Sequence, residues 1–540
     1  MRKIVECVPN FSEGRNKETI EAISNAIRNT KGCRLLDVDP GQSTNRTVYT
    51  FVGDPESVVE GALAAARVAR QKIDMRTHTG EHHRMGALDV CPFIPVAGAT
   101  MEDCVEISKT FGRRAAEELG IPVYLYEASA TLEYRKTLPQ IREGQYEGLK
   151  QKIARKEWKP DFGPAAFIPE WGATVTGGRF FLIAYNVNLL STSSQAHRIA
   201  LNLREAGRGP GEPGRLKEVK GMGWYVKDYN LSQVTVNLTN YEVTAPHVLY
   251  EEVKREAKKL NVAPAGSEIV GVIPLKAMLM AADYYIEKEN LFILDEDQKV
   301  RLVIDRLGLN SVAPFHPGEK IIEYIIAEEK NEPLASLTVR AFIDEVASRS
   351  TAPGGGSVSA AMAAMGAGLG SMAAKLTLGV RKFEALDAKM RKIIPPLHEA
   401  SRALIPMIDA DTDAFKDYVD ALHLPEDTEE EKNEKQEKLQ EGLKKAIEVP
   451  LATMTLADAA WDAMIETAGY ANIASKSDIQ VGAKALETGI WGAYKNVCIN
   501  MAGITDEKYR TRTLTLAEEM NSRARKQCQK VLKILENRKE

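Results

Sequence analysis

The chain has 540 residues, of which 44% are hydrophobic and 27% charged, and its 71 Lys and Arg nearly balance its 75 Asp and Glu. This composition is that of an ordinary globular protein, and it excludes collagen, a disordered tail protein and a disulfide-dense miniprotein. The net charge of −4 argues against a broad basic surface for nucleic acid or for an anionic membrane.

The six cysteines and the N-terminus both indicate a cytoplasmic protein. No two cysteines form a CxxC pair, so we expect free or buried thiols in a reducing compartment. The first residues, MRKIVECVPNFSEG, lack the apolar segment that a signal peptide requires.

Up to about residue 326, short apolar runs alternate with amphipathic helical windows. Runs rich in Val, Ile, Tyr and Phe predict strands, and three-to-four spacing of apolar residues predicts the helices between them. The first series has strands at 4–11, 33–41, 46–53, 91–98 and 121–127, and helices at 17–29, 56–72 and 101–119. The second has strands at 180–190, 223–229, 233–239 and 268–274, and helices at 195–205, 248–259 and 275–286. We therefore predict two α/β (α+β) sheet subdomains with flanking helices, at 1–178 and 179–326.

After a linker at 327–335, residues 336–540 lack strand signals and predict an all-α helical bundle. Residues 354–374 carry no charge and are long enough to span a bilayer, but their Ala, Gly, Ser and Met content favours a close-packed helix of a soluble bundle. Gly366 and Gly370, four residues apart, would suit a close helix crossing. The mixed charges of 426–441 favour a solvated helix face over a partner-binding arm.

Three of the eight histidines, His78, His82 and His83, fall within six residues. The spacing of His78 and His82 could bring two imidazoles onto one helical turn with Cys91 near, which is compatible with zinc. Thr79-Gly80 between them favours a loop instead. The residues alone leave zinc binding, general acid–base catalysis and a structural role open.

Two glycine-rich segments are candidate ligand sites. Residues 163–172, GPAAFIPEWG, predict a rigid loop whose aromatic side chains could hold a flat heterocycle or could simply pack where domains join. Residues 353–357, PGGGS, precede a helix whose N-terminus could bind an anion, or they could permit close helix crossing. The second segment matches neither the P-loop nor the dinucleotide fingerprint.

Three aspartates alternate in IDADTDAF. A calcium loop is disfavoured because Ala414 occupies the required Gly position and Asp420 the required Glu position. On a helix, Asp409 and Asp413 would share one face, whereas Asp411 would point nearly opposite, toward the bundle interior. Asp411 is therefore the candidate functional carboxylate.

Six segments, VECVPNFSEG, STNRTVYTFVG, MGALDVCPFIPV, WGATVTG, PGGGSV and ALETG, resemble the formimidoyltransferase-cyclodeaminase family, the bifunctional folate enzymes of histidine degradation. The resemblance runs nearly end to end. It implies that the first half transfers a formimino group from N-formimino-L-glutamate to N5 of tetrahydrofolate. It also implies that the second half closes the ring to 5,10-methenyltetrahydrofolate and releases ammonia.

The resemblance also assigns site residues. His82 corresponds to the transferase catalytic histidine, with His83 in place of the usual proline, and Asp411 corresponds to the cyclodeaminase catalytic aspartate. We expect Asp39, at the end of a predicted strand, to orient His82. The folate-binding residues implied are Gly163, Pro164, Ala165, Ala166, Phe167, Ile168, Pro169, Glu170, Trp171 and Gly172. Glu170 would place a negative charge beside an acidic ligand.

The family implies no metal and no tightly bound cofactor, only tetrahydrofolate as co-substrate. It further implies a homo-oligomer, an octameric ring that retains polyglutamylated intermediate, and in vertebrate members an association with the Golgi and with intermediate filaments. Three alternatives stay open: one active half, a helical half limited to methenyl-folate hydrolysis, and an oligomeric scaffold without turnover. The presence of both His82 and Asp411 argues against the scaffold.

Overall fold

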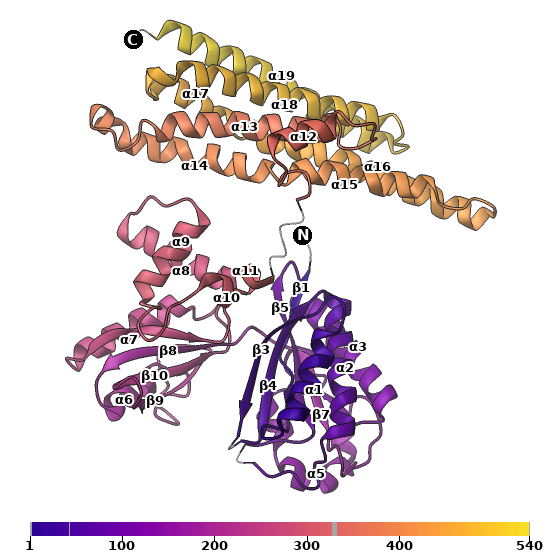
Figure 1. The fold of residues 1–540 in the computed structure, drawn as a ribbon, viewed down its shortest axis with the longest axis vertical. Coiled ribbons are helices and arrows are strands. Elements are labelled where there is room, and N and C mark those ends of the chain that lie inside the picture. Colours follow the sequence, from indigo (N-terminus) through magenta and orange to yellow (C-terminus); the bar gives the residue numbers. More distant parts are fainter. Residues whose placement is uncertain (1–2, 43, 81, 327–331, 539–540) are drawn as a thin grey trace. The chain divides into compact units, whose positions relative to one another are not determined.

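The computed structural model describes residues 3–42, 44–80, 82–326 and 332–538, which form two compact units, Met1–Ala327 and Glu328–Glu540. The first unit contains two sheets with flanking helices, and the second is helical throughout its described residues (Figure 1). This confirms the predicted fold class. Of the expected linker 327–335, residues 327–331 lie outside the described residues.

The first sheet has the order β1-β4-β2-β5-β7-β6, with β3 paired to β4. Strand β7 is parallel to β5 and to β6, and the other pairings are antiparallel. The strands are β1 (Ile4–Cys7), β2 (Asn10–Phe11), β3 (Arg34–Gly41), β4 (Arg46–Gly53), β5 (Leu88–Ala97), β6 (Val123–Leu125) and β7 (Thr174–Gly178). The run predicted as one strand at 4–11 is two strands, separated by Val8 and Pro9, because proline has no N–H to offer a sheet ladder.

Helices cover both faces of this sheet. Buried residues of α1 (Lys17–Arg28), α2 (Pro55–Lys72) and α3 (Met101–Leu119) form one apolar cluster with Phe11, Phe51 and Phe93. Local signals set the helix starts, since Asn16 and Asp54 cap α1 and α2, and Thr100 forms a capping box on α3. The shorter α4 (Leu138–Arg142) and α5 (Gln145–Ile153), which we did not predict, pack with strand residues of the opposite face, among them Val90 and Val175.

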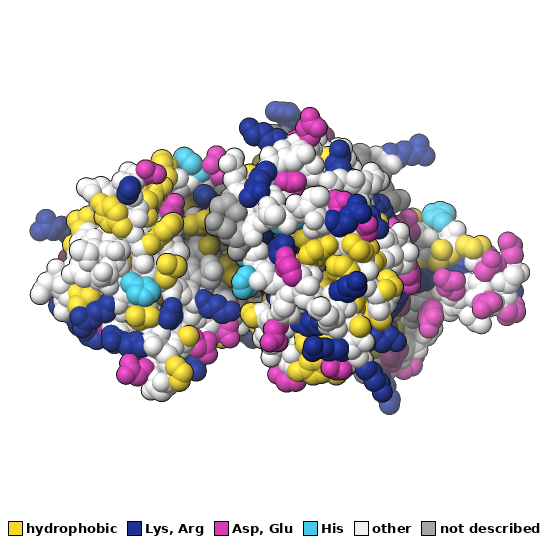
Figure 2. All heavy atoms as spheres, turned by 90° about the horizontal axis from the view of Figure 1, so that it is seen from below, with side chains coloured by type: hydrophobic (Ala, Val, Ile, Leu, Met, Phe, Trp, Pro, Cys, Tyr) yellow, Lys and Arg dark blue, Asp and Glu magenta, His cyan; other side chains and the backbone are white. Residues whose placement is uncertain are grey.

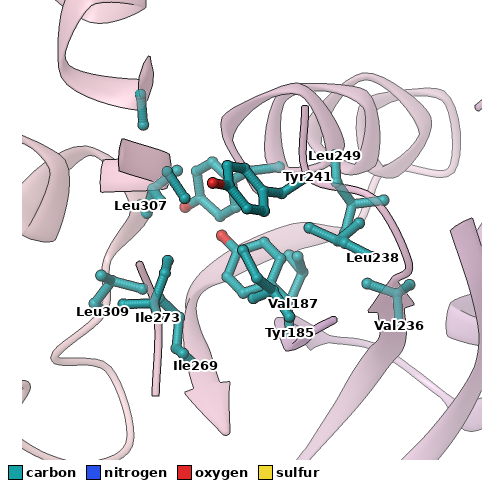
Figure 3. Close-up of a cluster of buried hydrophobic side chains, with 14 of the residues drawn as sticks. Tyr185, Val187, Val236, Leu238, Tyr241, Leu249, Ile269, Ile273, Leu307 and Leu309 are labelled. Atoms are coloured by element: carbon teal, nitrogen blue, oxygen red, sulfur yellow. The ribbon is translucent and has the colours of Figure 1, made fainter. Parts of the chain in front are cut away.

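The second sheet is antiparallel, in the order β11-β8-β10-β9, with strands β8 (Ile183–Leu190), β9 (Val219–Val226), β10 (Leu231–Leu238) and β11 (Ala263–Val270). Its helices are α6 (Ser193–Leu203), α7 (Pro246–Lys259), α8 (Leu275–Glu289), α9 (Glu296–Leu307), α10 (Pro317–Lys320) and α11 (Ile322–Ile326). Figure 3 shows the core between them, where the buried Tyr185 hydroxyl donates to Ser267 Oγ at 2.8 Å.

Two strand predictions in this sheet are displaced. The strand expected at 223–229 is β9, which ends at Val226, and the residues that follow form the turn into β10. Asn230 adopts a left-handed φ of 52° in that turn. The strand expected at 268–274 is β11, which begins and ends earlier.

The second unit is a bundle around α13 (Gly355–Lys375), which packs against α14 (Asp387–Leu404), α15 (Met407–Leu422) and α18 (Lys476–Met501). By length and composition α13 could cross a membrane, but 61% of its apolar window is buried within the unit. A Cβ at Gly366 would lie 2.6 Å from Leu486 N, and one at Gly370 2.8 Å from Met464 Cε, so the predicted close helix crossing is confirmed. The remaining helices are α12 (Val339–Val346), α16 (Glu429–Asp458), α17 (Trp461–Tyr470) and α19 (Glu507–Asn537).

Charges are mixed on the surface. On the face shown in Figure 2, Lys and Arg side chains are interspersed with Asp and Glu. The charge run 426–441 leads into and begins α16, and none of its residues is buried, as expected for a solvated helix face. Short 3-10 turns complete the described structure at Glu127–Ser129, Glu133–Arg135, Lys156–Trp158, Arg381–Leu386 and Ile473–Ser475.

Candidate active sites

The half-buried His82 lies in the segment between α2 and β5 and is held by Arg46 of β4. Arg46 Nη1 is 2.7 Å from both ring nitrogens, and His82 Nδ1 is 2.7 Å from the carbonyl oxygen of His83. A carbonyl only accepts, so this contact places the ring proton on Nδ1 and leaves Nε2 as the acceptor. Burial first, and the Arg46 cation second, lower the pKa of His82. The imidazole is therefore held neutral, with one basic nitrogen.

His78 has a different environment. Its Nε2 is 2.8 Å from the carbonyl oxygen of Asn45, and its Nδ1 accepts from Arg84 Nε at 3.2 Å. Arg84 is fixed in turn by an ion pair with Glu147, at 2.7 Å. Both ring nitrogens are thus engaged, so the geometry does not support zinc shared with His82. Among the residues that the structure describes, no three His, Cys, Asp or Glu side chains are grouped to hold a metal.

His82 opens onto a pocket of about 880 Å³, lined by His82, His83, Pro139, Gln140, Arg142, Glu143, Gly144 and Gln145. Arg142, in its wall, donates to the carboxylate of Asp89, a residue only 1% exposed. The other oxygen of Asp89 accepts from the Met85 backbone N–H at 2.8 Å. Two guanidinium groups, those of Arg46 and Arg142, therefore lie around His82, whereas Asp89 provides one buried carboxylate. The excess of positive charge suits an anionic ligand.

Asp39 does not orient His82. It lies exposed on β3, opposite Val48 of β4. Among the described residues, the His82 ring accepts from Arg46 at Nε2 and donates to the His83 carbonyl from Nδ1. The expectation failed because it assumed that the strand end faced the histidine, whereas the side chain at that position points to solvent.

The loop 163–172 lies against the segment that leads to β5. Both Gly163 and Gly172 have a φ of +83°, and a Cβ at Gly172 would lie 2.0 Å from the Met85 carbonyl oxygen, so glycine is required there. The loop also contacts Tyr146, which follows the pocket residue Gln145: the Tyr146 hydroxyl donates to the Pro169 carbonyl at 2.5 Å, and its ring packs 5.4 Å from that of Phe167. Tyr146 thus connects the loop to the pocket wall.

The side chains of this loop differ in exposure. Gly163, Pro164, Ala165, Ala166 and Pro169 are exposed, Phe167, Ile168 and Glu170 are half-buried, and Trp171 and Gly172 are buried. Trp171 is fully buried, with its indole N–H donating to Thr174 Oγ1 at 3.0 Å, so its ring is core and cannot stack on a ligand. Glu170 forms an ion pair with Arg76 at 3.0 Å, but Arg76 also pairs with Asp74 at 2.6 Å, so the negative charge of Glu170 is only partly balanced.

In the second unit, the half-buried Asp411 on α15 faces the N-terminus of α13. A Cβ at Gly356 would lie only 1.9 Å from Asp411 Oδ1, and Ser357 Oγ donates to Asp411 Oδ2 at 3.5 Å. Burial raises the pKa of Asp411, whereas the Ser357 backbone N–H counteracts that rise. Of the two alternatives for the PGGGS segment, the one with an anion at the helix N-terminus is met by the carboxylate of Asp411 itself.

We expected Asp411 to point to the bundle interior and Asp409 to lie on the opposite face of the helix, but Asp409 is buried as well. Asp409 is 5% exposed, and its carboxylate accepts from the backbone N–H groups of Leu334 at 2.7 Å and Ala335 at 3.0 Å. Asp413, in contrast, is exposed and lies 3.6 Å from Lys416. The helical periodicity separates Asp409 from Asp411 as expected, but the chain at 334–335 covers the Asp409 side, so both sides of α15 are buried there.

Sequence analysis missed four residues around the two candidate groups. Arg46 and Asp89 stand in the segments STNRTVYTFVG and MGALDVCPFIPV without a signal of their own, and nothing in the sequence marks Arg142. Gly356 belongs to the PGGGS segment, whose pattern does not indicate that a side chain lies against it. All four acquire their positions through contacts between residues far apart in the chain.

Three family models match the chain in sequence order. One described as the N-terminal subdomain of the formiminotransferase domain matches residues 4–179, and one described as the formiminotransferase domain matches residues 184–327. A third, described as formiminotransferase-cyclodeaminase, matches residues 338–519.

Named relatives match the whole chain or one of its halves. A formimidoyltransferase-cyclodeaminase of Dictyostelium discoideum is 57% identical and covers 100% of both chains. A glutamate formimidoyltransferase of Streptococcus pyogenes serotype M1 is 42% identical over 54% of this chain and 95% of its own length. A methenyltetrahydrofolate cyclohydrolase of Methylorubrum extorquens is 34% identical over 32% of this chain and 83% of its own. The full-length similarity and the three matched models show that the chain belongs to the formimidoyltransferase-cyclodeaminase family.

Proposed function

We propose that this chain is a bifunctional folate enzyme of histidine degradation. Its first unit transfers the formimino group of N-formimino-L-glutamate to N5 of tetrahydrofolate. Its second unit cyclises 5-formiminotetrahydrofolate to 5,10-methenyltetrahydrofolate and releases ammonia. One observation carries this proposal. Each unit is matched by its own family model and holds a half-buried group suited to proton transfer, His82 in the first unit and Asp411 in the second.

His82 would act as general base and then general acid in formimino transfer. N5 must lose a proton as it attacks the formimino carbon, and the departing glutamate nitrogen must gain one. A neutral imidazole whose Nε2 accepts can perform both steps in turn. Because Arg46 also contacts Nε2, the guanidinium must turn toward an anionic group of the substrate before this nitrogen takes the proton.

Arg142 and Arg46 would bind the carboxylates of the substrates. Arg142 lines the pocket, and its ion pair with Asp89 fixes the guanidinium at the wall. Both substrates carry glutamate carboxylates, which a guanidinium binds through paired N–H groups. The folate would contact the exposed part of the loop 163–172, with Phe167 as the half-buried aromatic side chain and Trp171 as support beneath it.

Asp411 would serve the cyclisation. N10 attacks the amidine carbon and loses a proton, the carbon–nitrogen bond breaks, and the leaving nitrogen departs as ammonia. The amidine and the methenyl product are both cations, so one carboxylate can pair with the positive charge and carry the proton from N10 to the leaving nitrogen. The raised pKa of Asp411 suits a group that must both accept and return a proton.

Further properties rest on family resemblance. We propose a polyglutamylated folate as co-substrate, a homo-oligomer of the octameric-ring type and a cytoplasmic location, with an association with the Golgi or with filaments if the chain behaves as the vertebrate members do. All six cysteines are free thiols, which supports a reducing compartment. Light scattering behind size-exclusion chromatography tests the oligomer, localisation of a tagged chain tests the location, and the KM for mono- and polyglutamylated tetrahydrofolate tests the co-substrate.

Separate assays test the two activities. One measures formimino transfer from N-formimino-L-glutamate to tetrahydrofolate, and the other measures ammonia released from 5-formiminotetrahydrofolate. Both activities are expected. Transfer without ammonia release would leave one active half, hydrolysis of the methenyl product without ammonia release would favour a cyclohydrolase, and no turnover at all would favour a scaffold.

A further inference from the structure

Lys152 is a buried cation of the first unit that does not line the His82 pocket. It lies at the end of α5, is 8% exposed, and its ammonium stacks 3.8 Å from the centre of the Trp158 ring. Its Nζ donates to three backbone carbonyls, those of Ile141 and Glu143 at 2.8 Å and that of Gln140 at 3.3 Å. An ammonium has three N–H donors, so these carbonyls and the ring replace the water that burial removed.

The three carbonyls belong to the segment that forms the pocket wall. Helix α4 has only five residues, so its last carbonyls have no partner within the helix, and Lys152 reaches back from α5 to satisfy them. The same segment, 139–145, supplies six of the eight residues that line the pocket, among them Arg142. The ammonium group therefore does not line the pocket itself, but it bonds to three carbonyls of the segment that does.

We propose that Lys152 is a positioning residue of the transferase pocket: its ammonium holds the turn between α4 and α5 so that Arg142 faces His82. This inference rests on the proposed role of that pocket in formimino transfer. Asp89 fixes the Arg142 side chain, whereas Lys152 fixes the backbone that carries it, so the two contacts restrain the guanidinium from both ends.

The charge of Lys152 is itself sensitive to pH. Burial lowers its pKa to about 8; the charged side chains that act on it are Glu143, which raises the pKa, and Arg155, which lowers it. A neutral amine keeps only two N–H donors for three carbonyls. Above about pH 8 the wall should therefore loosen, whereas an arginine at this position would stay protonated.

The test compares Lys152→Met, which keeps the stem on Trp158 but removes every donor, with Lys152→Arg. Lys150→Met, at an exposed position on the same helix, is the matched control. For Lys152→Met we expect the KM for N-formimino-L-glutamate to rise roughly tenfold or more with a smaller change in kcat, because displacement of a binding group weakens positioning. Lys152→Arg should recover much of this loss and abolish the rise of KM above pH 8. Ammonia release from added 5-formiminotetrahydrofolate, catalysed by the other unit, should be unchanged and reports that the chain is folded.

Hydrogen exchange gives a readout that does not depend on activity. Amides of residues 138–147 should exchange faster in Lys152→Met than in wild type or Lys150→Met. The inference is overturned by a KM within twofold of wild type, or by exchange at 138–147 that matches wild type. It is also overturned if kcat and KM of both activities change together, since that indicates general destabilisation. If instead His82→Ala transfers the formimino group normally, the proposed function of the pocket fails, and the exchange result alone decides whether Lys152 holds this segment.

Discussion

Gly356→Ala should stop ammonia release while leaving the helical unit folded. Gly356 lies in the first turn of α13 with no left-handed backbone, so alanine fits the helix itself. Its new methyl group, however, would lie 1.9 Å from Asp411 Oδ1, where ordinary contacts begin at 3.4 Å. The carboxylate must therefore move by about 1.5 Å, the difference between these distances.

The expected changes in stability and in rate depend on which atoms the new methyl group displaces. The obstructing atoms are Cγ and both oxygens of the Asp411 carboxylate, at 1.9 to 2.4 Å, and no backbone atom is among them. The carboxylate can therefore rotate away, and the better helix propensity of alanine, ~1 kcal/mol, partly offsets the cost. Stability should thus change by no more than about 1 kcal/mol. A displacement of this size is enough to cost about 10²-fold in rate when the displaced group performs proton transfer.

Gly355→Ala is the matched control, because a Cβ at Gly355 has no atom within 4 Å among the described residues. The assay measures ammonia release from 5-formiminotetrahydrofolate, with formimino transfer and thermal unfolding recorded on the same preparations. We expect Gly355→Ala to keep ammonia release and Gly356→Ala to lose it, with transfer retained in both. Ammonia release in Gly356→Ala within threefold of Gly355→Ala would refute the assignment of Asp411 to the chemistry.

The remaining predictions concern the two proton-transfer groups and Asp409. Asp411→Asn should fold and transfer the formimino group yet accumulate 5-formiminotetrahydrofolate, because an amide neither pairs with the cation nor carries the proton; prompt ammonia release would contradict this. His82→Ala should lower transferase kcat by ~10²–10⁴ with ammonia release from added intermediate intact, and near-normal transfer would exclude His82 as the base. Because burial and Arg46 lower the pKa of His82, its basic form persists to lower pH. The apparent pKa on the acid side of the pH profile of transferase kcat/KM should therefore lie below the ordinary histidine value of 6.5. An apparent pKa above that value would contradict the environment described. Asp409→Asn presents an NH₂ group to a backbone donor and should destabilise the helical unit by ~1–3 kcal/mol, measured by denaturant unfolding, with the rate of ammonia release per folded enzyme largely kept.

Local sequence patterns were sufficient for most of the fold. Apolar periodicity, the runs rich in Val, Ile, Tyr and Phe, and the loss of strand signals after residue 326 predicted two sheet subdomains and a helical bundle. These signals are local because backbone hydrogen bonding and side-chain spacing within a helix or strand depend on neighbouring residues. Short elements without such signals, including α4 and α5, were missed.

The candidate groups themselves, His82 and Asp411, could be named from the sequence and its family resemblance, but their surroundings could not. The glycine-rich segment 353–357 left anion binding and close helix crossing both open, and only the packing of α15 against α13 showed that the carboxylate of Asp411 lies at Gly356. Packing likewise buried Asp409 beneath residues 334–335 and left Asp39 in solvent. Arg46 and Arg142 meet His82 from segments far away in the chain, because a pocket is formed where distant segments pack together and no local spacing encodes that contact.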